Sequence, residues 1–213
     1  MKDRSSFLQN SFTDLMASLA VIFILLTVVF IKNASERSQK DKEELRQGLA
    51  EVLDKNQHTL VQDPADPLSL SVRVSEGLLK FPLNSAAVSP AGVGFLANFI
   101  PALAKQLCQE DLRASLDSVV IEGHTDRSGE ESPVGTGRNI RLSQERAFSV
   151  LSQALNAVRG DPTLHECLLK LASASGRGSR SPVISEGEYR ADLSRRVEIK
   201  IRMKSNEQKF FVK

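Results

Sequence analysis

The sequence predicts an α/β (α+β) sandwich preceded by a single transmembrane helix and a short amphipathic helix. Three patterns predict this fold: one long apolar run near the N-terminus, short segments in which apolar and polar residues alternate, and helical repeats of apolar residues between those segments. Alternation is typical of strands with one solvated face. Strands separated by helices indicate helices packed on a face of the sheet. With 213 residues, the chain is long enough for one domain and an appendage.

The apolar run predicts a transmembrane helix over residues 12–32. Twenty helical residues at about 1.5 Å each extend for roughly 30 Å, which matches the hydrocarbon core of a bilayer. A cleaved signal peptide is the alternative, but it needs a shorter apolar core and small residues at a cleavage site. Residues 32–35, Lys-Asn-Ala-Ser, fit that requirement poorly. We therefore expect an uncleaved, single-pass anchor in the inner membrane.

Composition and motifs exclude several functions. The formal net charge is +2, the basic residues are scattered and no RNA-binding motif is present, so we expect no direct contact with nucleic acid. His58, His124 and His165 fall in no metal-ligand spacing, and neither a C-x-x-C pair nor a nucleophile motif occurs. We expect no metal, no cofactor and no enzymatic activity, and His124 is interpreted as a structural hydrogen-bonding residue.

Two cysteines, Cys108 and Cys167, lie in the large C-terminal part of the chain. A periplasmic location would permit a disulfide between them, which would close a long loop. Two buried free thiols are the alternative. The sequence leaves both possibilities open.

Residues 33–67 are expected to be a linker with a charged amphipathic helix that Pro64 and Pro67 end. One interpretation is a solvated stalk or a parallel dimer contact, because the apolar stripe is narrow. The other is a plug that lies on the membrane before activation. The stripe consists of Leu45, Leu49, Val52 and Leu53.

The remaining elements are expected within residues 68–204, followed by a tail over residues 205–213. A hairpin or bent strand pair is predicted from Leu68 to Phe81, and Ser89-Pro90 predicts the start of a helix that Pro101 kinks. The other predicted elements are strands over residues 118–122, 168–174 and 197–203, and a helix over residues 139–158 with Leu142, Phe148, Leu151 and Leu155 directed inward.

Asp14 lies near the start of the apolar run. An ionised Asp costs about 2.5 to 3.5 kcal/mol at a bilayer centre and less near its boundary, so such residues usually face a partner or a path of water. Under one hypothesis Asp14 only completes a capping box with Ser11 as the N-cap. Under the other it carries protons, and its change of charge alters which partner helix it faces. Taken alone, the residues do not decide between them.

Several separated motifs occur in one order: residues 121–126 (Ile-Glu-Gly-His-Thr-Asp), a Gly-rich loop through Gly137, residues 139–147, residues 176–178, Pro182 and residues 195–199. Together they resemble the OmpA-like peptidoglycan-binding domain over residues 68–204. The resemblance implies that the chain binds peptidoglycan.

The same resemblance assigns the ligand contacts. Asp126 would bind the ammonium of the diaminopimelate side chain and Arg146 its carboxylate, which a guanidinium binds bidentately. Asn139 and Leu142 would contact the ligand or shape its loop. The alternative is that Asp126 bonds only loop amides, while Arg146 pairs with a neighbouring acid, Glu145 or Glu122.

One membrane helix with an early aspartate, followed by such a domain, resembles the B subunit of MotA/MotB-type stators. The compact layout is closer to the B subunits of Zorya anti-phage defence complexes than to flagellar stators. The resemblance implies a homodimer inside a ring of multi-span MotA/ZorA-like subunits, with Asp14 carrying H⁺, residues 1–11 in the cytoplasm and the C-terminal domain in the periplasm. A flagellar stator subunit is the alternative within this family. A passive tether between membrane and wall is the alternative from another class.

Overall fold

The computed structural model describes residues 3–53, 59–62, 66–79, 81–82, 84–205 and 208. The chain divides into two compact units, Met1–Asp41 and Lys42–Lys213. Helix α1 (Asp3–Leu53) contributes residues to both units. The tail predicted over residues 205–213 lies almost wholly outside the described residues.

The first unit is helical from Asp3 onward. Among the described residues, one segment, Phe12–Asn33, is long and apolar enough to cross a membrane by length and composition. Its large apolar side chains are exposed all around the helix, which is typical of a helix that lies in lipid or against other helices. Ser11 lies within α1, so the hypothesis that it is the N-cap of this helix is wrong.

The second unit includes the last turns of α1. Leu45 and Leu49 are fully buried and Leu53 is 5% exposed, because all three belong to the core of this unit. The prediction of a solvated stalk is therefore wrong for these residues. The predicted helix also ends earlier than expected, at Leu53, and β1 (Thr59–Val61) follows. Pro64, one of the two predicted terminators, lies outside the described residues.

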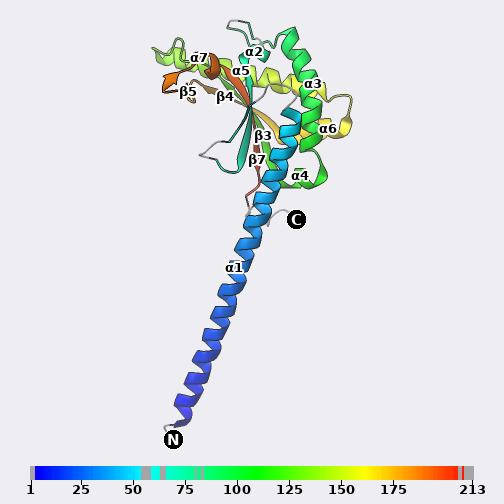
Figure 1. Ribbon diagram of the computed structural model, residues 1–213. Coiled ribbons are helices and arrows are strands. Elements are labelled where there is room, and N and C mark those ends of the chain that lie inside the picture. Colours follow the sequence, from blue (N-terminus) through cyan, green and yellow to red (C-terminus); the bar gives the residue numbers. More distant parts are fainter. Residues whose placement is uncertain are drawn as a thin grey trace. The chain divides into compact units, whose positions relative to one another are not determined.

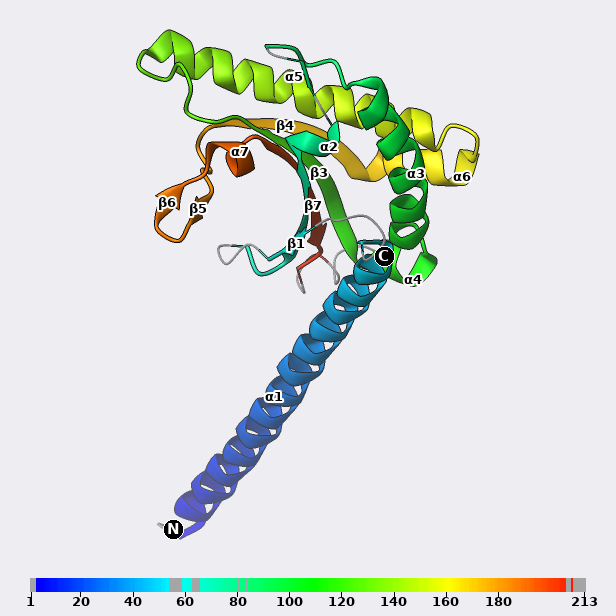
Figure 2. The same cartoon turned by 45° about the horizontal axis from the view of Figure 1, so that its top comes forward.

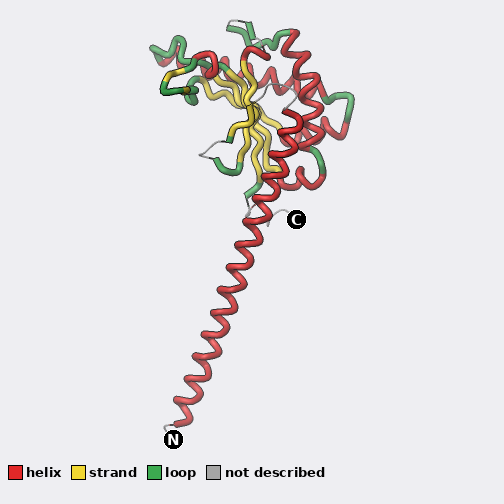
Figure 3. The backbone as a smooth tube through the Cα atoms, in the orientation of Figure 1, coloured by secondary structure: helices red, strands yellow, loops and turns green. Residues whose placement is uncertain are grey.

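Five strands form the main sheet of the described residues, in the order β1-β2-β7-β3-β4 (Figure 3). All neighbours are antiparallel except β3 and β4, which are parallel. Val72, Ile199 and Ile121 lie side by side across three strands, so the apolar rows predicted by alternation meet on one face. The strands are β2 (Ser69–Ser75), β3 (Leu116–His124), β4 (Ala172–Gly178) and β7 (Arg196–Met203).

Helices α3 (Pro90–Leu107), α5 (Pro133–Ala157) and α6 (Pro162–Leu171) lie together on one side of this sheet (Figures 1 and 2). Ser89 caps α3 as its sequence predicts, because its hydroxyl accepts a hydrogen bond from the amide of Gly92 at 3.1 Å. The smaller elements are α2 (Glu76–Leu79), α4 (Glu110–Ser115), β5 (Ile184–Ser185), β6 (Glu188–Tyr189) and α7 (Ala191–Ser194).

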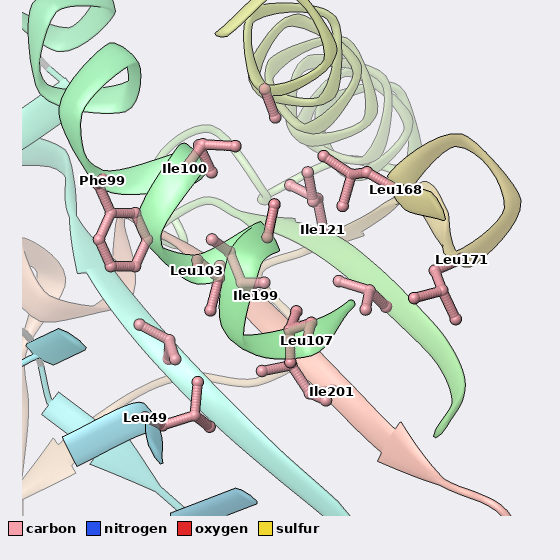
Figure 4. Packing of buried hydrophobic residues seen from close by; sticks show 14 of the residues in the cluster. Leu49, Phe99, Ile100, Leu103, Leu107, Ile121, Leu168, Leu171, Ile199 and Ile201 are labelled. Carbon is pink, nitrogen blue, oxygen red and sulfur yellow. The ribbon is translucent and has the colours of Figure 1, made fainter. Parts of the chain in front are cut away.

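The core lies between the sheet and these helices (Figure 4). Phe99 and Leu107 of α3 are buried against the apolar face of the sheet, where Ile199 and Ile201 of β7 are also buried. Leu168 and Leu171 of α6 complete the same cluster. The apolar alternation of the sheet and the helical repeats thus meet in one core, as expected for a sandwich of this class.

Several predicted elements are wrong in detail. The second strand expected after Gly77 is the short helix α2, and the strand expected from Leu168 is the end of α6 followed by β4. Helix α5 begins at Pro133, so Gly137 lies inside the helix and not in a loop. Phe148, predicted to face inward, is 62% exposed.

Cys108 follows α3 and Cys167 lies in α6, and the two form a disulfide with a Cα–Cα distance of 6.2 Å. The bond joins two helices that lie on the same face of the sheet. Because the two cysteines are 59 residues apart, the chain-entropy model assigns the loop closure about 4 kcal/mol of stability.

Replacing both cysteines, Cys108→Ser with Cys167→Ser, should lower the free energy of unfolding by about 4 kcal/mol, since the unfolded chain regains the freedom that the loop removes. Urea unfolding measures this change. The native chain treated with dithiothreitol serves as the control and should match the double variant. Equal stability of the oxidised and reduced chains would contradict the prediction.

Candidate functional site

Asp126 follows the C-terminal end of β3 by two residues, where the chain turns away from the sheet. Its Oδ1 atom accepts a hydrogen bond from the amide of Ser128 at 2.9 Å, which closes a tight turn. Its Oδ2 atom lies 2.7 Å from Nη1 of Arg195. One carboxylate oxygen therefore fixes the loop, and the other carries an ion pair.

Asn139 holds this loop against helix α5. Its side-chain amide donates to the backbone carbonyls of Asp126 at 3.3 Å and of Ser128 at 3.1 Å. The sequence leaves two roles open for Asn139, contact with the ligand and shaping of its loop. The described contacts of Asn139 are those of a residue that shapes the loop. Leu142 is half-buried about one turn further along α5.

Two glycines allow α5 to approach the sheet closely enough to reach this loop. Gly123 of β3 and Gly176 of β4 are register partners. A Cβ atom on Gly123 would lie 2.1 Å from the carbonyl oxygen of Ser143, and one on Gly176 would lie 2.5 Å from the amide nitrogen of Gln144. Side chains at either position would therefore push α5 away from the sheet.

Polar contacts complete this junction. The side chain of Gln144 accepts a hydrogen bond from the amide of Gly176 at 2.6 Å, and Ser143 Oγ accepts one from the amide of Gly178 at 2.9 Å. The backbone of β4 is thus bonded to side chains of α5. This junction fixes the distance between the loop after β3 and the residues of α5 that follow.

Arg146 lies on the same helix and is 6% exposed. Its Nε atom donates to the carbonyl of Ser85 at 3.0 Å, and its guanidinium lies 4.8 Å from the ring centroid of Phe81. Its Nη1 atom is 3.3 Å from Oε1 of Glu76. These contacts hold the guanidinium in one orientation.

Glu76 and Arg195 connect the two residues that the sequence singled out. Glu76 Oε2 accepts a hydrogen bond from Arg195 Nε at 2.6 Å, and Arg195 also pairs with Asp126. The four side chains therefore alternate in charge, in the order Arg146, Glu76, Arg195 and Asp126, and the row is neutral as a whole. We call these four residues the charge row.

Ionisation of the charge row follows from these contacts. Burial alone would raise the pKa of Asp126, but hydrogen bonds from Arg195 and Ser128 outweigh it and hold that pKa below its usual value. Hydrogen bonds with Asp126 and Glu76 raise the pKa of Arg195. Burial lowers the pKa of Arg146, against the opposing charge of Glu76. Asp126 and Arg195 are therefore both charged at neutral pH.

The structure brings Asp126 and Asn139 together at one loop and links Arg146 to Asp126 through Glu76 and Arg195. It also changes the expected partner of Arg146. Glu145 pairs instead with Arg141 at 2.8 Å, so the alternative in which Glu145 neutralises Arg146 is wrong. Glu122 lies 3.8 Å from His124 and 3.9 Å from Arg177. Sequence patterning does not single out Glu76, because the hairpin predicted from Leu68 to Phe81 places this residue in a turn.

A second group of titratable side chains comes from β3 and β7. One ligand atom from each of Glu122, His124 and Glu198 lies within 4.8 Å of the other two, a spacing that a metal ion could bridge. The sequence spacing of the histidines missed it, because Glu198 is supplied by a distant strand. However, Oε1 of Glu198 already bonds Arg73 at 3.2 Å and Arg196 at 2.6 Å, so a cation at this group would be repelled by two guanidinium groups.

The Asp126→Asn variant should lower the free energy of unfolding at neutral pH by about 1 to 3 kcal/mol, because Arg195 loses a charged partner. Since folding lowers the pKa of Asp126, its contribution is complete above the unfolded value near pH 4 and disappears as the pH falls through the folded value. Urea unfolding measures this change. The free energies of unfolding of the variant and the native chain should differ by a large amount at pH 7 and by a small amount near pH 3.

Asp192→Asn is a matched control, because Asp192 and Arg190 form an ion pair at 2.8 Å that is exposed to solvent. This variant should change stability far less. A difference between Asp126→Asn and the native chain that stays constant from pH 7 to pH 3 would contradict the assigned ion pair.

The chain is similar to several known proteins in sequence and in fold. No family model matches the chain. The chain is similar to the Zorya protein ZorB of Escherichia coli, with 27% identity over 94% of this chain and 89% of that protein. A solved MotB-like protein from Desulfovibrio vulgaris is 19% identical with a TM-score of 0.52, over 79% of this chain and 96% of that chain.

Another solved structure, the cell wall anchor of the T6SS from Pseudomonas aeruginosa, has 25% identity and a TM-score of 0.47, over 75% of this chain and 97% of that chain. The sequence similarity extends over nearly the whole chain, and the shared fold covers most of it. The chain is thus similar to ZorB in sequence, and most of it has the fold of the MotB-like protein.

Proposed function

We propose that this chain is the cell-wall-anchored B subunit of a proton-driven motor in the inner membrane, of the Zorya type. Its similarity to ZorB supports the type of complex. The apolar segment Phe12–Asn33 supports a single span. In the proposal, the N-terminus lies in the cytoplasm and the second unit in the periplasm. The proposal includes no catalytic role and no bound cofactor.

The observation that carries wall binding is the charge row. Its two ends, Asp126 and Arg146, are an acid and a guanidinium on neighbouring elements, and each is partly or largely buried. A zwitterion such as the diaminopimelate side chain carries an ammonium and a carboxylate, which complement these two ends. The row is neutral and already paired, so the ligand binds by exchange of ion pairs.

In this exchange the ligand's ammonium replaces Arg195 at Asp126, and its carboxylate replaces Glu76 at Arg146. Glu76 and Arg195 remain bonded to each other, at the 2.6 Å contact that already joins them. No buried charge is left without a partner at the end of the exchange, which avoids the large cost of an unpaired buried ion. Arg146 also keeps its bond to Ser85 and its contact with Phe81.

Asp14 is the proton carrier of the proposed motor. Two copies of the chain would lie within a ring of multi-span MotA/ZorA-like subunits, where the partner helices would shield Asp14 from lipid. Each proton that moves down the membrane potential releases about 2.3 kcal/mol per 100 mV. Wall binding would hold the pair of B subunits still while the ring turns around it.

Asp126→Ala and Arg146→Ala should each abolish pelleting of the purified chain with peptidoglycan, because each removes the group that binds one charge of the zwitterion. Sedimentation of the chain in detergent with purified sacculi measures this binding. Arg141→Ala is a matched control, since Arg141 lies on α5 and pairs with exposed Glu145. It should pellet like the native chain.

Glu76→Gln tests the exchange in the same assay, because it removes the carboxylate that competes with the ligand for Arg146. It should pellet at least as strongly as the native chain. Unchanged pelleting of Asp126→Ala and Arg146→Ala would reject the site. Loss of pelleting in Glu76→Gln would reject the exchange while leaving the site in place.

Asp14→Asn should abolish ion-driven activity of the complex coexpressed with its multi-span partner, because an amide cannot gain or lose a charge. Proton flux into vesicles that contain the assembled complex measures this activity. Glu36→Gln is a matched control, because Glu36 lies beyond the apolar segment and pairs with exposed Lys32. Full flux in Asp14→Asn would leave only a passive tether between membrane and wall.

A further inference from the structure

A pocket of about 240 Å³ lies among the polar side chains of the sheet, on the face opposite helices α3, α5 and α6. It is separate from the charge row, and none of the four charge-row residues lines it. Four cationic side chains and two carboxylates from four strands surround it. The lining includes Arg73 of β2, Glu122 and His124 of β3, Arg177 of β4, and Arg196, Glu198 and Lys200 of β7.

Cross-strand register explains how these charges come together. Glu198 lies opposite Arg73 on one side and opposite Glu122 on the other. The carboxylates of Glu122 and Glu198 repel each other in these opposed positions, so cations are needed around the pair. Arg196 and Arg73 bond Glu198, and Arg177 lies 3.9 Å from Glu122.

His124 lines this pocket, and its two ring nitrogens are buried. The residue is 3% exposed, and neither of its ring nitrogens has a partner among the described residues. The sequence interpretation of His124 as a hydrogen-bonding residue is therefore wrong for the contacts described. Burial, followed by the charge of Arg196, lowers the pKa of His124 to about 3, so the ring is neutral and offers one N–H donor.

Charge decides which kind of ligand the pocket would take. A cation bound to Glu122, His124 and Glu198 would lie beside Arg73 and Arg196, whose Nε atoms both contact Oε1 of Glu198. Like charges so close together repel each other, and burial strengthens that repulsion. An anion leaves every existing ion pair intact and adds an acceptor for the histidine N–H.

We propose that this pocket binds a small oxyanion of the phosphate class. The neutral His124 ring would donate one hydrogen bond to the anion, and Arg177, whose side chain is 48% exposed, would bind the anion from the solvent side. Arg73 and Lys200 add positive charge from the neighbouring strands. This site is independent of wall binding, because it uses the other face of the sheet.

Inorganic phosphate, titrated into the full chain in detergent at pH 7.5 and followed by calorimetry, should bind saturably with one site per chain. Arg177→Gln should weaken this binding about tenfold, the effect expected for one charge-assisted hydrogen bond at a partly exposed position. Arg180→Gln is the matched control, because Arg180 is a nearby exposed arginine that does not line the pocket. It should bind phosphate like the native chain.

Nitrogen NMR of the histidine side chains gives a second readout. Phosphate should shift the ring signals of His124 and leave those of His58 and His165 in place. Asp126→Ala should bind phosphate normally even if it no longer pellets with peptidoglycan, so the two sites fail separately. The proposal is overturned by an absence of saturable binding, by equal weakening in Arg177→Gln and Arg180→Gln, or by binding of Zn²⁺ in place of phosphate.

Discussion

The close approach of helix α5 to strands β3 and β4 is the constraint on which the candidate wall-binding site depends. Gly123 and Gly176 leave no Cβ between the strands and the helix, and Gln144 bonds the helix to the backbone of β4. Asn139 and Arg146 are then separated by two turns of the same helix, one against the loop of Asp126 and one near Glu76. The geometry of the site thus follows from two small residues that make no contact with a ligand.

The charge row shows how such a site can be fully paired both when it is empty and when a zwitterion is bound. A buried acid or guanidinium left without a partner is costly, so a site built from Asp126 and Arg146 alone would be unstable when empty. Glu76 and Arg195 remove this cost, and they also bond each other. The binding free energy of a zwitterion is therefore a difference between two fully paired states. Affinity would be set by this difference and by the desolvation of the ligand, and not by the strength of any one pair.

The sequence predicts the helices and strands whose pattern depends on neighbouring residues. It does not predict features that depend on contacts between distant parts of the chain. The alternation of β7 and the Ser-Pro start of α3 were sufficient, because each depends on neighbouring residues. The same Ser-Pro signal occurs at Ser132-Pro133, but the glycines that follow favoured a loop, and packing on the sheet makes them helical. Asp126, Asn139 and Arg146 were predicted as site residues because they lie in motifs that resemble the OmpA-like domain. Glu76 had no local signal, since its role depends on Arg195, which lies 119 residues away.

The buried end of α1 bears on how a wall anchor could resist a turning ring. Leu45, Leu49 and Leu53 belong to the core of the second unit, and α1 is helical without a break from Asp3 to Leu53. Exposing a buried leucine costs about 1.5 to 3 kcal/mol, so three such residues oppose any motion that pulls the helix out of the domain. A solvated stalk would not resist such a motion, because none of its side chains would be packed in the domain. Its own backbone would twist instead. In the proposed motor, the load is therefore transmitted through packed apolar side chains before it reaches the charge row.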